Sequence, residues 1–143
     1  MSVTVEVTRH ASEELLAGIN RLLPQLSTSA PPLTMDDLEE LVSSPSVSLF
    51  VASKDGVIVG TLTLVVFAIP TGLRAWIEDV VVDEAMRGLG VGAALTTAAA
   101  DEARLRGVRS VDLTSRPSRE AANSMYLNLG FALRETNVYR LSL

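Results

Sequence analysis

The feature that most restricts the fold is a strand-like run followed by a glycine-rich loop and a helical pattern, all within residues 76–106. Apolar and β-branched residues lead to Val82, and a short acidic connection leads to Arg87. Three glycines then stand at alternate positions: Gly88, Gly90 and Gly92. Glycines at the start of a helix let a ligand approach the backbone, and the free N–H groups of the first turn favour a phosphate group. The segment therefore predicts a strand, a turn and a helix whose N-terminus can hold an anion.

Two common nucleotide-binding motifs do not match this loop. A dinucleotide fingerprint needs G-x-G-x-x-G in the first strand-helix unit, whereas this spacing is G-x-G-x-G, roughly two-thirds of the way along the chain. A P-loop needs G-K-[ST], whereas Gly92 is followed by Ala93 and Ala94. The remaining pattern is R-x-x-G-x-G, formed by Arg87, Gly90 and Gly92. Its plainer interpretation is a glycine-rich turn before a tightly packed helix.

Composition narrows the classes of function. The 143 residues carry 12 Lys and Arg against 17 Asp and Glu, a net charge of −5. This balance disfavours a nucleic-acid partner, which would need a basic face. The chain has no cysteine and one histidine, so a zinc site would have to rest largely on carboxylates, and no metal is expected.

Length and hydropathy predict one domain over residues 1–143, because a 48% hydrophobic content is enough for a core. No apolar run reaches the length of a membrane span, and no basic segment followed by an apolar one opens the chain. A soluble, cytoplasmic protein without membrane contact is the expectation.

The first half of the chain predicts a strand, two helices and a hairpin. Residues 3–7 alternate as in a strand, a helix is predicted over residues 12–23 with Pro24 as its stop, and a second helix follows Thr34. Residues 47–53 and 57–67 are β-branched runs separated by Asp-Gly, a strong hairpin signal. The central strand through Trp76 then completes a three-stranded meander.

The second half predicts a parallel strand, another helix and a final strand. A helix is predicted over residues 90–106 and a strand over 108–114, which makes one parallel βαβ unit. Ser118 is expected to cap a helix that runs through Leu129, and residues 138–143 are expected to form the last strand. The sheet is therefore expected to be mixed.

Two segments resemble the GNAT superfamily of N-acetyltransferases. The R-x-x-G-x-G pattern resembles its acyl-CoA pyrophosphate loop, and Met125 to Phe131, M-Y-L-N-L-G-F, resemble the L-Y-x-x-x-G-F signature near the end of most members. Together they cover about half the chain, and residues 76–83, W-I-E-D-V-V-V-D, are similar to the small-amine and amino-sugar branches. The resemblance implies the GNAT fold, an α/β (α+β) single domain with a mixed central sheet flanked by helices.

The resemblance also implies where acetyl-CoA, the co-substrate, binds. The pyrophosphate would be held by the loop residues Arg87, Gly88, Leu89, Gly90, Val91 and Gly92. In the family the central strand separates from its neighbour through a bulge, so that backbone groups of Val80, Val81 and Val82 would face the acetyl-pantetheine arm. Arg119 is a further candidate, although many members have at this position an asparagine that bonds the cofactor.

Tyr126 has two interpretations. Its helical spacing among apolar residues is typical of an aromatic side chain in the core. In the family, however, this tyrosine lies next to the sulfur of the cofactor, which implies that Tyr126 is the general acid toward the coenzyme A thiolate.

Glu78 and Asp79 are the acids best placed to act on an amine. Adjacent residues of a regular strand point to opposite faces, so only one of the two can address the cleft unless a bulge intervenes. We expect Glu78, which has the longer reach, to take part in deprotonating the acceptor and Asp79 to position it. The alternative is that both hold the strand in register through ion pairs to Arg74 or Arg87.

These expectations combine into an enzyme, an acyltransferase that moves an acetyl group from acetyl-CoA to a primary amine of a small molecule by direct transfer in a ternary complex. Two alternatives stay open. One is acetylation of a protein N-terminus or lysine, and the other is a non-catalytic acyl-CoA-binding regulator on the same fold. A homodimer is expected from the resemblance alone, since many relatives are dimers.

Overall fold

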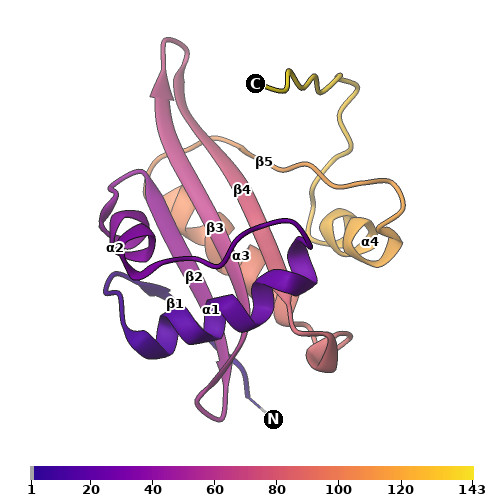
Figure 1. Cartoon of the computed structure of the whole chain (residues 1–143). Coiled ribbons are helices and arrows are strands. Elements are labelled where there is room, and N and C mark those ends of the chain that lie inside the picture. The colour runs from indigo at the N-terminus through magenta and orange to yellow at the C-terminus, as the bar shows by residue number, and fades with distance from the viewer. Residues whose placement is uncertain (1) are drawn as a thin grey trace.

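The computed structural model describes residues 2–143, so Met1, the first residue of the expected domain, lies outside the described part. Five strands form one mixed sheet in the order β1-β2-β3-β4-β5, and helices lie on both faces (Figure 1). The strands are β1 Thr4–Thr8, β2 Val47–Lys54, β3 Val57–Ile69, β4 Gly72–Val82 and β5 Val111–Asp112. The helices are α1 Glu13–Leu26, α2 Met35–Ser43, α3 Val91–Leu105 and α4 Glu120–Asn128, with a 3-10 turn, η1, at Glu84–Met86. The expected mixed α/β architecture is confirmed.

Helices α1 and α2 begin as the sequence predicts. The Ser12 hydroxyl accepts a hydrogen bond from the Leu15 N–H at 3.1 Å, and the Thr34 hydroxyl accepts one from the Asp37 N–H at 3.1 Å. The predicted end of α1 is wrong, because the helix continues past Pro24 to Leu26. Proline removes a single backbone donor there, and the Ser27 N–H still closes the last turn on the Leu23 carbonyl at 2.9 Å.

The first four strands are joined antiparallel, and the predicted hairpin is present between β2 and β3. Its turn residues Asp55 and Gly56 have φ values of 52° and 77°, the left-handed conformation that a two-residue hairpin turn requires. Pairing of β4 with β5 is parallel, as the βαβ unit predicts. No helix within residues 2–143 combines the length and apolar character needed to span a membrane.

Two apolar layers enclose the sheet. On one face α3 packs through Val91, Leu95 and Ala99 onto strand residues such as Leu62 and Ile77. On the other face α1 and α2 pack onto Leu49 and Val51 of β2. Close approach of α3 is possible because β3 has a glycine at Gly60, where a Cβ atom would lie 3.1 Å from the Leu95 side chain. The sheet is thus fixed between two helical layers up to the end of α3.

The last third of the chain departs from the prediction in three places. Strand β5 spans only Val111–Asp112 of the predicted 108–114, because its pairing with β4 covers two residues. Helix α4 has Arg119 at its N-cap position without a side-chain cap, so the expected capping by Ser118 is wrong. The final strand over 138–143 does not form, because the segment after Phe131 leads away from α4 toward the C-terminus and pairs with no strand of the sheet (Figure 1).

Candidate active site

A bulge interrupts β4 where the two candidate acids stand. Thr61 of β3 pairs with Val81 and Thr63 pairs with Glu78, so Leu62 alone lies opposite two residues, Asp79 and Val80. Asp79 has a φ of 48°, in the left-handed region that few non-glycine residues adopt. An extra residue of this kind leaves backbone groups outside the ladder and re-aims the neighbouring side chains. Both Glu78 and Asp79 are exposed.

The edge of β4 toward β5 is open beyond this point. Pairing between the two strands is limited to Ala75 with Val111 and Trp76 with Asp112. From Ile77 to Val82, β4 therefore has no partner strand on this side within the described residues. Val80, Val81 and Val82 lie in this stretch, and those of their peptide groups that point away from β3 have no partner strand there.

The glycine loop follows directly after η1 and leads into α3. Gly88 and Gly90 have φ values of 81° and 82°, and no neighbouring atom lies within 4 Å of a Cβ built on either. Gly90 is the N-cap of α3, and no side chain caps the helix. The first N–H groups of α3, beginning at Val91, therefore point outward without an intrahelical acceptor. Arg87 and Leu89 are exposed beside them, so the loop presents several donors and one positive charge.

A residue cluster that the sequence analysis missed ties this loop to α1. The Arg21 guanidinium donates to the Asp83 carboxylate at 2.8 Å and also to the Ile58 carbonyl. Gln25 accepts a hydrogen bond from the Glu84 N–H at 2.9 Å. The hydrogen bond from Arg21, together with one from the Ala85 N–H, holds the pKa of Asp83 below its ordinary value. Local sequence gives no signal for this cluster, because its members are about 60 residues apart.

Helix α4 brings Tyr126 to the same end of α3. A Cβ atom on Gly92 would lie 3.4 Å from the Met125 methyl group, so the third glycine of the loop is what lets α4 approach. Tyr126 is half-buried, and its ring packs against Phe131 with centroids 5.6 Å apart at 59°. Burial raises the pKa of the Tyr126 phenol, and the positive charge of Arg119 opposes part of the rise.

The ion pairs of the structure bear on the alternative roles of the two acids. Residues 2–143 form three ion pairs, namely Arg21–Asp83, Arg104–Asp101 and Arg106–Glu102. Neither Glu78 nor Asp79 takes part in one, so the structure gives no support to the view that they hold the strand in register. Within the same residues, no group of three or more His, Cys, Asp or Glu side chains comes together as a metal site.

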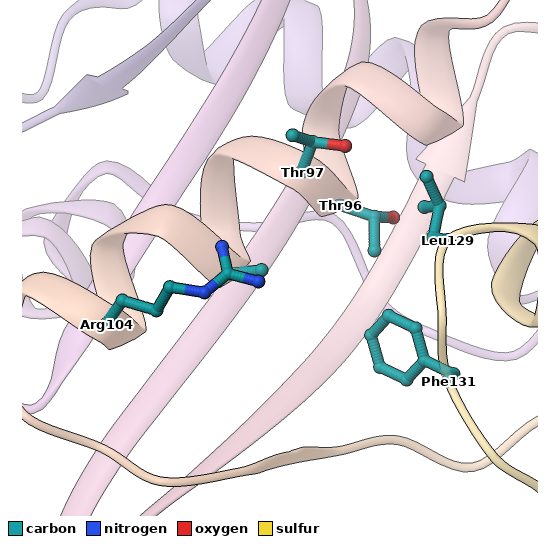
Figure 2. Close-up of a pocket in the computed structure, with 6 residues that line it drawn as sticks. Thr96, Thr97, Arg104, Leu129 and Phe131 are labelled. Atoms are coloured by element: carbon teal, nitrogen blue, oxygen red, sulfur yellow. The ribbon is translucent and has the colours of Figure 1, made fainter.

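Two hollows of the surface lie beside this region. A cavity of about 80 Å³ separates Thr96, Thr97 and Arg104 of α3 from Leu129 and Phe131 after α4 (Figure 2). A larger hollow of about 560 Å³ lies under α1 and is lined by residues such as Glu6, Gly18 and Ile58. Neither is lined by Tyr126, Glu78 or the glycine loop. Glu78, Asp79 and the loop residues Arg87 to Gly90 are exposed, whereas Tyr126 is half-buried.

Comparison with known proteins concerns the family and the fold of the chain. Residues 15–131 match the family model described as the acetyltransferase (GNAT) family. An acetyltransferase of Trypanosoma brucei shares 29% identity with a TM-score of 0.81, covering 99% of this chain and 100% of its own. A putative acetyltransferase from Agrobacterium tumefaciens shares 27% identity with a TM-score of 0.83 over the same shares of both chains.

At lower identity, a structure solved with a ligand shares the fold of this chain. AAC(6')-Iy in complex with the bisubstrate analogue CoA-S-monomethyl-acetylneamine shares 19% identity with a TM-score of 0.83, covering 100% of this chain and 99% of its own. Among curated proteins, none matches the sequence well enough to count as a relative.

Proposed function

Because the chain belongs to the acetyltransferase (GNAT) family, we propose that it moves the acetyl group of acetyl-CoA to a primary amine of a small molecule, within a ternary complex of both substrates. The whole chain, residues 1–143, acts as one catalytic domain in this proposal. The proposal also includes a cytoplasmic location and a homodimeric state.

One observation carries the proposal, the bulge at Asp79 in a strand whose far edge is open. A regular, fully paired β4 would have no backbone groups to offer and would place neighbouring acids on opposite faces. The bulge and the open edge remove both obstacles at the same residues. A binding surface for an extended cofactor arm and two exposed carboxylates thereby meet on one strand.

The proposed cofactor contacts follow from the available donors. The pyrophosphate would accept hydrogen bonds from the N–H groups of Gly88 to Gly92, including those of Leu89 and Val91, with Arg87 adding a positive charge. Backbone groups of Val80, Val81 and Val82 would bond the pantetheine arm. Arg119, whose charge reaches Tyr126, is placed to approach the same ligand from α4.

Tyr126 is the proposed general acid. A thiolate that leaves the acetyl group takes up a proton, and the donor must hold that proton at neutral pH. Burial keeps the pKa of the Tyr126 phenol above its ordinary range, so the group stays protonated until the thiolate forms. The half-buried setting of Tyr126 beside Phe131 also fixes the direction of the ring.

Glu78 is the proposed group that removes the ammonium proton of the acceptor, directly or through water. Ala75 and Ile77 face the core beneath α3, so alternation places Glu78 on the opposite face, toward α1. Asp79, in the bulge itself, would position the acceptor or the adjacent backbone. The acid and the base thus come from different elements, α4 and β4.

A small amine is the proposed acceptor class for two reasons. Residues 76–83 are similar to the small-amine and amino-sugar branches of the family, and AAC(6')-Iy, whose fold matches, binds an analogue that joins CoA to acetylneamine. Thr63 lies across from Glu78 on β3 and offers a hydroxyl group on the acceptor side.

The test is a screen of amines, amino sugars and peptides with acetyl-CoA, followed by detection of the free thiol. We expect turnover with at least one small amine and a loss of about 10- to 1000-fold in kcat for Tyr126→Phe, with cofactor affinity nearly unchanged. Tyr139→Phe is the matched control, because Tyr139 is the other tyrosine of the chain and lies exposed after α4.

Three results would each contradict part of the proposal. Turnover with peptides alone would replace the acceptor class. Binding of acetyl-CoA without turnover on any amine would favour a regulator. Unaltered kcat in Tyr126→Phe would make the tyrosine a packing residue.

A further inference from the structure

One face of the hairpin formed by β3 and β4 is only partly covered. Leu62 and Leu64 of β3 are fully buried on the side of α3. Val65 and Phe67, on the opposite face of the same strand, are half-buried. Within residues 2–143, neither apolar layer includes Val65, Phe67 or Trp76 of β4. Figure 1 shows that α1, α2 and the segment joining them cover this face nearer the β2–β3 turn, whereas the hairpin end of β3 and β4 extends beyond them. An apolar surface left out of the core is typical of a binding site.

The register of the strands places Trp76 on this face, beside the proposed base. Trp76 pairs with Val65, and Glu78 pairs with Thr63. Thr63 in turn pairs with Leu49, which belongs to the layer formed with α1 and α2. Directly opposite residues of antiparallel strands share a face, so Trp76 and Glu78 both lie on the side of α1. They are two residues apart, which is about 7 Å along an extended strand.

Arg74 continues the same row toward the end of the hairpin. It pairs with Phe67 and is exposed. Alternation along β4 puts Arg74 on the face of Trp76 and Glu78, with about 13 Å between the Cα atoms of the two charged residues. Within residues 2–143, no ion pair includes Arg74 or Glu78. The row therefore has a carboxylate at one end, an aromatic side chain in the middle and a guanidinium group at the other end.

We propose that this row binds the acceptor, and that the acceptor is a primary amine on an apolar skeleton that ends in a carboxylate. Its ammonium group lies at Glu78, its skeleton packs on Trp76 and Val65, and its carboxylate pairs with Arg74. Arg is suited to this role because its planar fork binds a carboxylate through two hydrogen bonds. A polycationic amine would bring a like charge to Arg74. This inference rests on the proposed function and adds to it the class of amine.

Three amines of equal length test the row. They are ω-aminooctanoic acid, n-octylamine and octamethylenediamine, which end in a carboxylate, a methyl group and a second ammonium group. We expect the KM to be lowest for ω-aminooctanoic acid and highest for octamethylenediamine, because only the last brings a like charge to Arg74. Calorimetry with the protein saturated with coenzyme A should give the same order of Kd without any turnover.

The two measurements separate this inference from the proposed function. Binding in the expected order without acetyl transfer would support the row and contradict the proposed function. Acetyl transfer to amines with no preference among the three compounds would support the proposed function and overturn the row. Absence of binding for all three compounds would also overturn the row.

Reversing the charge of Arg74 is the sharpest test of the far end. Arg74→Glu should raise the Kd of ω-aminooctanoic acid by about 10- to 100-fold and lower that of octamethylenediamine, with n-octylamine changed less than about 2-fold. Arg104→Glu is the matched control, because it makes the same change on α3, on the other face of the sheet. It should leave all three values unchanged. An unchanged order of the three amines in Arg74→Glu would overturn the proposal.

The apolar middle of the row is tested by Trp76→Thr, which keeps a residue that favours strands. Loss of the aromatic surface should raise the Kd of ω-aminooctanoic acid and of n-octylamine alike, by about 10-fold. The affinity for acetyl-CoA should stay the same, which also shows that the variant is folded. Phe67→Thr probes the same surface one strand away from the β4–β5 pair and should act in the same direction with a smaller effect. Parent-like affinity for both amines in the two variants would overturn the proposal.

Discussion

The chain before Arg106 and the chain after it are held in place differently. Strands β1 to β4 and helices α1 to α3 bury residues on both faces of the sheet. Beyond Val108 no described residue is fully buried, and α4 has no buried side chain. The bulge and the glycine loop belong to the first region, whereas Tyr126 belongs to the second. The proposed cofactor surface is therefore formed by the first region, while the proposed acid lies on a helix with few contacts.

The largest effect should be a difference between the two regions in how much a substitution lowers the free energy of unfolding. Leu95 is fully buried beneath the sheet, so Leu95→Ala should lower the free energy of unfolding by about 2–5 kcal/mol, from lost burial and the cavity left behind. Leu127 on α4 is 58% exposed, so Leu127→Ala should change it by less than about 0.5 kcal/mol. Urea unfolding measures both. Equal losses would mean that α4 is as firmly packed as α3.

The next effect concerns cofactor binding by the glycine loop, which belongs to the first region. Gly90→Val should weaken acetyl-CoA binding in calorimetry by on the order of 100-fold, because a branched side chain is strained at a φ of 82° and blocks the approach of the ligand to the N–H groups. Gly107→Val is the matched control, since Gly107 has a φ of 81° and lies at the other end of α3. A similar loss in both variants would assign the effect to strain alone.

A smaller effect should distinguish the base on β4 from the acid on α4. An amine with a pKa of about 9 or 10 is mostly protonated at neutral pH, so Glu78→Gln should lower kcat most there and recover part of the loss as pH rises. A pH-rate profile with a small primary amine measures this. Glu6→Gln, on the exposed far edge strand, is the control. A profile scaled down equally at every pH would remove Glu78 from proton transfer.

The smallest effect concerns the tie between α1 and the loop. The depressed pKa of Asp83 stabilises the fold above the ordinary carboxyl pKa of about 4, and this contribution is lost as pH falls through the lower folded value. Arg21→Met should therefore cost up to about 1 kcal/mol at pH 6, with the difference from the parent shrinking below about pH 4. Arg104→Met breaks the far more exposed Asp101 pair and should cost nothing measurable. A difference for Arg21→Met that stays constant down to pH 2 would show that the effect comes from packing.

The sequence predicted most of the first region and less of the second. Local interactions could be predicted, because their partners lie within four residues. Examples are the caps Ser12 and Thr34 and the turn at Asp55-Gly56. The length of β5, and whether residues 138–143 form a strand, depend on which edge of the sheet is free to pair. Strand propensity alone does not specify the pairing partner.

The candidate site shows the same division. The loop glycines and Tyr126 stand in recognisable local patterns, and the structure locates them at one end of α3. The bulge at Asp79 has no such pattern, since aspartate is not the residue that a left-handed conformation favours most. Arg21 and Gln25 were missed because their partners are brought to them by the packing of α1 over the sheet.

The extra residue at Asp79 also changes the parity of β4. Before it, odd-numbered residues such as Ala75 and Ile77 face the layer under α3, and after it the even-numbered Val80 and Val82 do. A chain lacking Asp79 would restore simple alternation with Val80 and Val82 still facing α3, so the extra residue changes the backbone of β4 without changing which valines enter the core.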